Sequence, residues 1–300
     1  MAEADMVFVN TEYGKDYVRL LHVRREGPLH HTREIEVNTT LTLACQKDYT
    51  HADNSDIIAT DTQKNTVYIL AKQRGIHNIE TFALILSNHF LDKYRHVTRV
   101  HIHIKEAPWR RMEVKGRPHN HAFISTNDGT RFCDVAHKRY ETPVVSAGIT
   151  DLKLMKTTQS AFTNFIRDEY CSLPEMNDRV FCTIVTAKWQ YSRSAGFCFD
   201  RAWEVVKSSI LEEFGGPSDT GVFSPSVQHT LYLTIKTAMA KVQEIDLMEI
   251  ELPNVHAYNV DYTKFPALNF KGSVNEVFMP VDKPSGNIKA TLARAKKAKL

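Results

Sequence analysis

The chain has 300 residues, of which 42% are hydrophobic, and this is enough for one large core or two smaller ones. Its 38 Lys and Arg residues nearly balance its 35 Asp and Glu residues, so the net charge of +3 gives no general field that would attract nucleic acid or a membrane surface. The five cysteines are odd in number and form no C-x-x-C, which favours reduced thiols in an intracellular protein over a disulfide framework.

The two ends of the sequence bear on its compartment. No apolar stretch reaches the length that spans a bilayer, and the first residues, MAEADMVFVN, lack the charged and apolar regions of a signal peptide. We therefore expect a soluble protein that is not secreted by the usual route. The last residues, Ala298-Lys299-Leu300, differ from the Ser-Lys-Leu peroxisomal address in the alanine. A frayed basic tail is the alternative reading, and the tripeptide alone favours neither.

Apolar and polar residues alternate on a period of two in four segments, which predicts strands over 15–23, 33–45, 97–107 and 179–191. In the second of these the apolar face consists of Ile35, Val37, Leu41, Leu43 and Cys45. One apolar and one polar face are typical of an antiparallel sheet. Apolar residues at helical spacing predict helices over 62–73, 78–94, 199–214 and 225–241. Strands followed by helices and then strands indicate an α+β fold.

The stretch NSDIIATDTQKNTVYILAKQ (54–73) joins two patterns. Residues 56–60 read as the end of a strand, and the helical spacing starts at Thr62. Between them lies Thr60-Asp61-Thr62, and each of these side chains could accept a hydrogen bond from an unpaired amide of the first helical turn. One cap needs one such residue, and we expect it to be Thr62, directly before the helical pattern. Another of the three is then available for chemistry.

An internal repeat relates the two halves of the chain. TDTQKNTVYILAK (60–72) aligns without gaps on SPSVQHTLYLTIK (224–236), with identical Thr, Tyr and Lys residues at three positions. Both copies begin with hydroxyl side chains and open an amphipathic helix. We expect two related modules, residues 1–145 and 146–300, joined near Pro143 to Gly148.

Histidine pairs suggest a metal site as one possibility. The sequence has no phosphate-cradling loop, dinucleotide fingerprint or nucleophile elbow. His101 and His103, and likewise His119 and His121, would lie on one face of an extended segment, a spacing that can hold Zn²⁺ or Fe²⁺. The first pair lies on the polar face of its strand, where solvent exposure explains it as well.

Three further polar residues stand at the ends of predicted elements. Lys15 follows a glycine at the mouth of a strand, Arg179 heads another strand, and Gln228 lies at a helix start. Each has an ordinary explanation as a solvated turn, a surface charge and a helix cap respectively. The residues alone leave both readings open.

Six motifs, in this order, resemble those of the uricase (urate oxidase) family: YGKDYVR, HADNSDIIATDTQKNTVY, QSAFTNFIRDEY, FSPSVQHTLY, LPNVHAYNVD and SGNIKATLAR. The resemblance covers nearly the whole chain. It implies tandem tunnelling-fold (T-fold) modules, each an antiparallel sheet with helices on one face, and a homotetramer in which the sheets form a barrel. It also implies active sites between subunits.

The resemblance further implies that urate is oxidised by O₂ and water to 5-hydroxyisourate and hydrogen peroxide, with no metal or organic cofactor. Substrate-binding roles would then fall on Thr60, Asp61, Phe162, Arg179, Val227 (through its backbone amide), Gln228 and Asn254. A proton relay would consist of Lys15, Thr60 and His256. Under the same resemblance His119 and His121 are structural residues, and peroxide production gives a chemical reason for a peroxisomal address.

Two other functions remain open. A metal-dependent enzyme of the same fold, acting on a pterin-like heterocycle, would use His101, His103, His119 or His121 as ligands. A non-catalytic purine-binding module would keep the substrate clamp and lose the relay, and the presence of Lys15 and Thr60 speaks against it.

Overall fold

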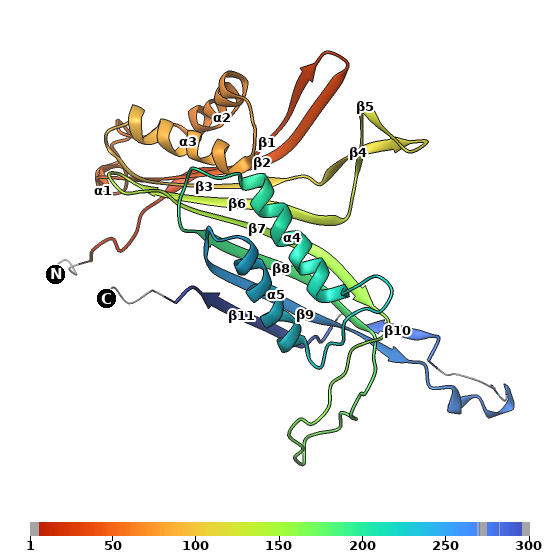
Figure 1. The fold of residues 1–300 in the computed structure, drawn as a ribbon. Coiled ribbons are helices and arrows are strands. Elements are labelled where there is room, and N and C mark those ends of the chain that lie inside the picture. Colours follow the sequence, from red (N-terminus) through yellow and green to blue (C-terminus); the bar gives the residue numbers. More distant parts are fainter. Residues whose placement is uncertain (1–5, 269, 271–274, 282, 296–300) are drawn as a thin grey trace, which may run out of the picture. The chain divides into compact units, whose positions relative to one another are not determined.

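The computed structural model describes residues 6–268, 270, 275–281 and 283–295. The chain divides into two compact units: unit 1 comprises residues 1–148 and 190–200, and unit 2 comprises residues 149–189 and 201–300 (Figure 1). The C-terminal tripeptide Ala298-Lys299-Leu300 lies outside the described residues. Among the residues described, no helix is long and apolar enough to cross a membrane.

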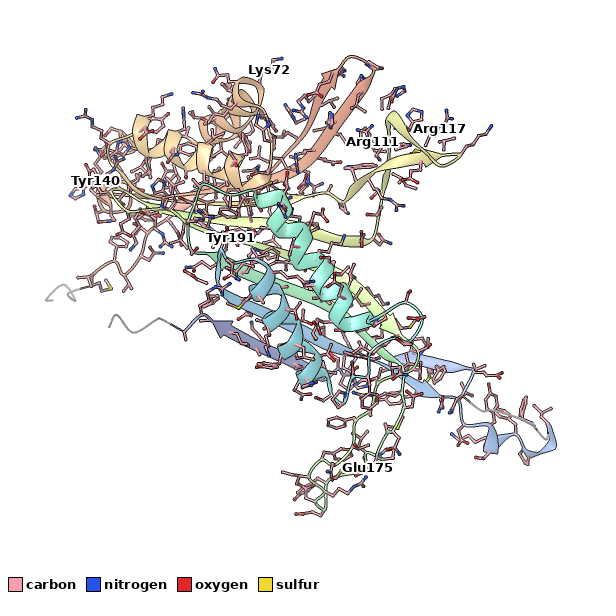
Figure 2. All side chains as sticks on the ribbon, viewed as in Figure 1. Lys72, Arg111, Arg117, Tyr140, Glu175 and Tyr191 are labelled. Atoms are coloured by element: carbon pink, nitrogen blue, oxygen red, sulfur yellow. The ribbon has the colours of Figure 1, made fainter. Side chains whose placement is uncertain are left out.

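Unit 1 is built on antiparallel strands in the order β1-β2-β3-β6, with β7 (Val144–Lys156) beginning beside β6. These strands are β1 (Tyr13–Glu26), β2 (Leu29–Leu43), β3 (Val97–Glu106) and β6 (Asp128–Lys138). A separate hairpin consists of β4 (Trp109–Val114) and β5 (Arg117–Ser125), and Figure 2 shows Arg111 and Arg117 on it. The helices are α1 (Lys47–Thr50), α2 (Thr60–Arg74) and α3 (Ile79–Lys93).

The core of unit 1 lies between the sheet and its helices, because α2 contacts β1 and α3 contacts β3 and β6. The alternation predicted for the second strand is confirmed for Ile35, Val37, Leu41 and Leu43, which are all buried. Cys45 is exposed, so its place on that face was predicted wrongly. Strand β2 ends at Leu43, and the chain then turns, with the Ala44 amide donating to the His96 carbonyl at 2.9 Å.

Unit 2 repeats this plan with the rest of β7 and with strands β8 (Phe181–Tyr191), β9 (Ile245–Asn259), β10 (Phe278–Val281) and β11 (Asn287–Ala293). Both β10 and β11 pair antiparallel with β9, along different parts of its length. Its helices are α4 (Phe199–Gly215) and α5 (Val227–Lys241), with short 3₁₀ helices at Tyr262–Lys264 and Pro266–Leu268. Helix α5 packs against β9 and β11. The predicted α+β class with antiparallel strands is thus confirmed.

The start of α2 differs from the prediction. The helix begins at Thr60, its N-cap is Ala59, and no side chain caps it, so the expected cap Thr62 is the third helical residue. Residues 56–59 form a turn and loop rather than a strand end. Side chains hold this loop: the Ile58 amide donates to Tyr13 Oη at 2.9 Å, and Gln63 Nε2 donates to the Ile58 carbonyl at 3.2 Å. The Gln63 side chain thus holds the loop directly before the helix start at Thr60. Local sequence patterns do not reveal such a contact.

A chain of ion pairs runs through unit 1. Arg131 on β6 donates to Glu80 of α3 at 2.7 Å and to Asp200 at 2.6 Å, and Arg33 on β2 donates to Asp200 at 3.0 Å. Burial raises the pKa of Glu80, whose side chain is fully enclosed, and the Arg131 charge opposes this rise. The network therefore fixes α3 to the sheet at the cost of dehydrating two charges.

Candidate active site

Lys15 lies on β1 at an irregularity in the pairing with β2. The register shifts between Lys15 and Val18, and Tyr17 in between has φ 58°, a left-handed conformation, with its amide donating to Asn38 Oδ1 at 2.8 Å. The preceding residue is glycine for a steric reason: a Cβ on Gly14 would lie 1.7 Å from the Thr39 carbonyl oxygen. The bulge is thus built into the local sequence, and bulges of this kind re-aim side chains near functional sites.

A buried threonine links Lys15 to the start of α2. Thr39 Oγ1 donates to Gln63 Oε1 at 2.8 Å and lies 3.5 Å from the Lys15 carbonyl oxygen. Thr39 and Gln63 are both fully buried. Because Gln63 also bonds to the loop before Thr60, this pair fixes the strand that carries Lys15 relative to the first turn of α2.

Thr60 and Asp61 are the first two residues of α2, and both are exposed. The carboxylate of Asp61 accepts from Lys64 Nζ at 2.5 Å and from Asn65 Nδ2 at 2.9 Å. These contacts lower the pKa of Asp61, chiefly through the hydrogen bond from Lys64, and the charge of Lys15 contributes in the same direction. Unit 1 therefore brings Lys15, Thr60 and Asp61 into one neighbourhood.

In unit 2, Arg179 precedes β8 and is held by its backbone. Its amide donates to the Ser160 carbonyl at 2.8 Å, and Ser160 forms a parallel bridge with Ser224, three residues before α5. The guanidinium carbon lies 5.5 Å from the centre of the Phe162 ring. Phe162 in turn stacks on Phe165, with centroids 4.9 Å apart and planes inclined by 10°. An arginine and a flat aromatic face thus lie beside each other near the start of α5.

The guanidinium of Arg179 has a buried nitrogen, Nε, that makes no hydrogen bond to the described residues. Burial lowers the pKa of Arg179, and in the part of the chain that the structure describes no carboxylate counteracts this. Because a dehydrated charge is costly unless it is paired, this arrangement is typical of a site whose counter-ion is a bound anion.

Helix α5 supplies further donors. Its N-cap Ser226 accepts from the His229 amide at 3.1 Å, so Val227 and Gln228 are its first two residues. The amides of a first helical turn have no partner within the helix and attract negative charge. The Val227 side chain is buried, whereas Gln228 is exposed and open to a ligand.

The two remaining predicted site residues lie on β9, also in unit 2. Asn254 is buried, and its backbone amide donates to the Gly286 carbonyl at 2.8 Å. His256 stacks on Tyr258, with ring centroids 5.6 Å apart, and pairs with Val281 of β10. Unit 2 therefore holds Phe162, Arg179, Val227, Gln228, Asn254 and His256, while the other three predicted residues belong to unit 1.

The paired histidines have structural partners. His101 Nε2 and His103 Nδ1 are both hydrogen-bonded to Asp134 Oδ1, at 3.1 and 2.9 Å. His119 Nδ1 accepts from the amides of His121 and Ala122. Within the described part of the chain, no group of three or more His, Cys, Asp and Glu side chains is arranged to hold a metal ion.

Sequence reasoning missed Thr39, Gln63 and Asp134. Asp134 lies directly opposite His103 in the β3–β6 pairing, and Thr39 lies opposite Lys15 in the β1–β2 pairing. Strand register creates both relations, and the alternation of apolar residues reveals which face a residue occupies but not which residue it faces.

The fold and these features define a T-fold protein with donors and an aromatic face suited to a flat, anionic heterocycle. A family model described as uricase matches residues 11–136 and 145–289. The chain therefore belongs to the uricase family, and it is an oxidoreductase that acts on urate and O₂.

Individual relatives agree with the family match. The uricase of Oryctolagus cuniculus is 46% identical over 296 residues, which cover 99% of this chain and 97% of the relative. The uricase of Danio rerio is 47% identical over 293 residues, with 98% and 97% covered. The crystal structure of uricase from Arthrobacter globiformis superposes with a TM-score of 0.88 at 32% identity, covering 97% of this chain and 96% of that one. The resemblance inferred from the sequence motifs is thus confirmed.

Proposed function

We propose that the chain oxidises urate with O₂ and water to 5-hydroxyisourate and hydrogen peroxide, without a metal or an organic cofactor. Urate gives up two electrons and O₂ takes them up, so the substrate performs the redox work that a cofactor otherwise carries. The observation that supports this proposal most directly is the half-buried Arg179 guanidinium, which lies over Phe162 and lacks a partner at Nε among the described residues.

In the proposed clamp, Arg179 and Gln228 bind the edge of the urate anion. A planar guanidinium presents paired donors, and an amide side chain presents one donor and one acceptor, a combination that selects a heterocycle over a simple carboxylate. The Val227 amide adds a third donor, and Phe162 stacks on the purine face, worth about 1 kcal/mol beyond the buried area. Asn254, together with Thr60, holds O₂ or the attacking water above the ring.

In the proposed relay, a proton passes from urate or water through the Thr60 hydroxyl to the Lys15 amine, and His256 orients the lysine. Thr60 is no base by itself, but its hydroxyl can accept one proton while it donates another. The contacts of Thr39 with Gln63 and with the Lys15 carbonyl support this pairing of strand and helix. Asp61 contributes negative charge at the positive end of α2.

We further propose two T-fold modules, residues 1–145 and 146–300, and a homotetramer whose sheets form a barrel. The active site would then combine Lys15, Thr60 and Asp61 of one subunit with the clamp of a neighbour. Activity would require assembly. Among the described residues, strands β1 and β11 each pair on one side only, which is consistent with pairing between subunits.

We place the enzyme in the peroxisome if an import receptor reads Ala298-Lys299-Leu300, and in the cytoplasm if it does not. Fusion of the last residues to a fluorescent reporter tests this. Punctate peroxisomal fluorescence, lost when Leu300 is deleted, is the expected outcome, and diffuse fluorescence of the intact fusion would assign the enzyme to the cytoplasm.

Arg179→Ala tests the clamp. We expect it to weaken the binding of a non-reactive urate analogue by about 2–4 kcal/mol, or roughly 30- to 1,000-fold in Kd, because the anion loses its charged partner in a dehydrated site. Isothermal titration calorimetry measures the change.

The matched control is Arg167→Ala. Arg167 lies on the same loop at 5.1 Å from the Phe165 ring, but its side chain is exposed. We expect its analogue Kd to stay close to that of the unmodified protein. Equal Kd values for Arg179→Ala and the unmodified protein, with the same oligomeric state, would refute the clamp.

A further inference from the structure

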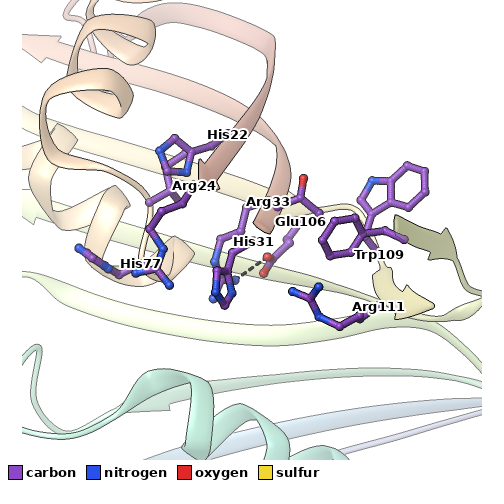
Figure 3. Close-up of a pocket in the computed structure, with 11 residues that line it drawn as sticks. His22, Arg24, His31, Arg33, His77, Glu106, Trp109 and Arg111 are labelled. Atoms are coloured by element: carbon purple, nitrogen blue, oxygen red, sulfur yellow. Dashed lines mark hydrogen bonds and ion pairs between the residues drawn. The ribbon is translucent and has the colours of Figure 1, made fainter. Parts of the chain in front are cut away.

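Unit 1 contains a cavity of about 350 Å³ that the urate site does not use. It lies between β1, β2, the turn from α2 to α3, the end of β3 and the β4–β5 hairpin (Figure 3). Cationic and imidazole side chains dominate its lining: His22, Arg24, His31, Arg33, His77 and Arg111. None of the predicted urate-site residues lines it.

The positive charge of this cavity is only partly neutralised. Glu106 is the single carboxylate in the lining, and it pairs with Arg33, which also pairs with Asp200. Arg24 has a loose partner in Glu26 at 3.3 Å, and both side chains are about half exposed. Arg111 donates from Nη1 and Nη2 to the carbonyl oxygens of His30, His119 and Asn120. These three bonds occupy part of its five N–H groups and supply no negative charge.

Two histidines of the lining, His22 and His31, also indicate an excess of positive charge. The pKa of His22 is lowered chiefly by burial, and the neighbouring Arg24, His77, Arg33 and Lys72 lower it further. His31 Nε2 is buried and lies 3.5 Å from Glu26 Oε2, with no hydrogen-bond partner among the described residues. An anion in the cavity would lower the electrostatic energy of all these groups together.

We propose that this cavity binds a soluble oxyanion of the phosphate class, either inorganic phosphate or a phosphate ester, separately from urate. A tetrahedral, multiply charged oxyanion has acceptors in several directions, and here guanidinium forks and imidazoles approach from different sides, as Figure 3 shows for Arg24 and His77 opposite Arg111.

The size of the cavity favours an ester over the bare ion. Trp109 lines the cavity beside Arg111, and its indole N–H donates to Glu34 Oε2 at 2.7 Å, which fixes the ring. Trp109 is 42% exposed and offers an apolar face next to the cationic groups. An organic phosphate could therefore place its charged group among the arginines and its carbon skeleton against Trp109.

Calorimetric titration of the full-length protein with inorganic phosphate and with pyrophosphate, at constant ionic strength, tests the proposal. Arg24→Gln removes a lining charge at an exposed position, so the fold should persist. Arg25→Gln is the matched control, because the next residue on β1 points to the opposite face and does not line the cavity. We expect Arg24→Gln to raise the Kd of pyrophosphate about tenfold, as for one charge-assisted hydrogen bond. Arg25→Gln should change it less than about twofold.

Four results would overturn the proposal. If neither anion binds saturably, the cavity is not a phosphate site. Equal weakening by the two substitutions means unspecific attraction. Displacement of pyrophosphate by a urate analogue assigns the anion to the active site. Sedimentation velocity on the same samples shows whether the protomers are assembled. If only dissociated protomers bind the anion, a neighbouring copy of the chain covers the cavity.

Discussion

Lys15→Met is expected to lower the turnover number with urate by about 10²–10⁴-fold, the usual contribution of a positioned acid or base. Methionine has a similar length and no amine, so the proposed relay loses the group that accepts the proton from the Thr60 hydroxyl. The Kd of a non-reactive urate analogue should change little, because Arg179 and Gln228, the proposed clamp, remain. Stopped-flow turnover and calorimetric binding on the same preparation separate the two effects.

The control for this prediction is Lys72→Met. Lys72 lies on α2 in the same unit and is exposed (Figure 2), so we expect unchanged turnover. Turnover of Lys15→Met within a few-fold of the unmodified protein would contradict the relay. A parallel loss of turnover and analogue binding would instead assign Lys15 to substrate binding.

Arg131→Met is expected to lower the free energy of unfolding by roughly 3–5 kcal/mol, because it leaves a buried carboxylate without its partner. Glu80 is fully enclosed, and Arg131 is the residue that pairs with it, at 2.7 Å. Part of the loss will be recovered by protonation of Glu80, whose pKa burial already raises. Urea denaturation followed by tryptophan fluorescence measures the change.

The double variant Arg131→Met, Glu80→Leu separates two explanations of that loss. If the cost comes from an unpaired buried charge, replacing both partners by apolar residues should restore much of the stability. Arg19→Met is the surface control: Arg19 pairs with Glu36 at 2.7 Å, but 76% of its side chain is exposed, so we expect little effect. Equal losses from Arg131→Met and Arg19→Met would contradict the assigned role of the network.

Local patterns predicted some of the regular elements well, for physical reasons. Strand β2 was predicted over 33–45 and spans Leu29–Leu43, and α3 was predicted over 78–94 and spans Ile79–Lys93. In both cases burial of one face imposes the period that the sequence shows. The prediction was wrong where a distant side chain decides the conformation, as at Thr62, because Gln63 bonds to Ile58 and Thr39 and draws the helix start back to Thr60.

The chemistry of the site could be predicted in part. The residue types of Lys15, Thr60 and Arg179 became informative only through their motifs, since each alone has an ordinary explanation. The dehydration of Arg179 and the sharing of Asp134 by His101 and His103 depend on strand pairing and burial, which no local pattern contains. The cationic cavity of unit 1 escaped sequence analysis for the same reason: its arginines and histidines come from β1, β2, the α2–α3 turn and β4. The near-neutral total charge conceals their concentration.

The central claim is that the chain oxidises urate without a metal or organic cofactor, and one measurement tests it most directly. Purified protein is treated with a strong chelator, its metal content is determined by elemental analysis, and urate absorbance and dissolved O₂ are recorded together. We predict that metal-free protein removes urate and O₂ in equal amounts at the rate of untreated protein. Loss of activity on chelation, with recovery on adding back a stoichiometric metal ion, would contradict the account and favour the metal-dependent alternative.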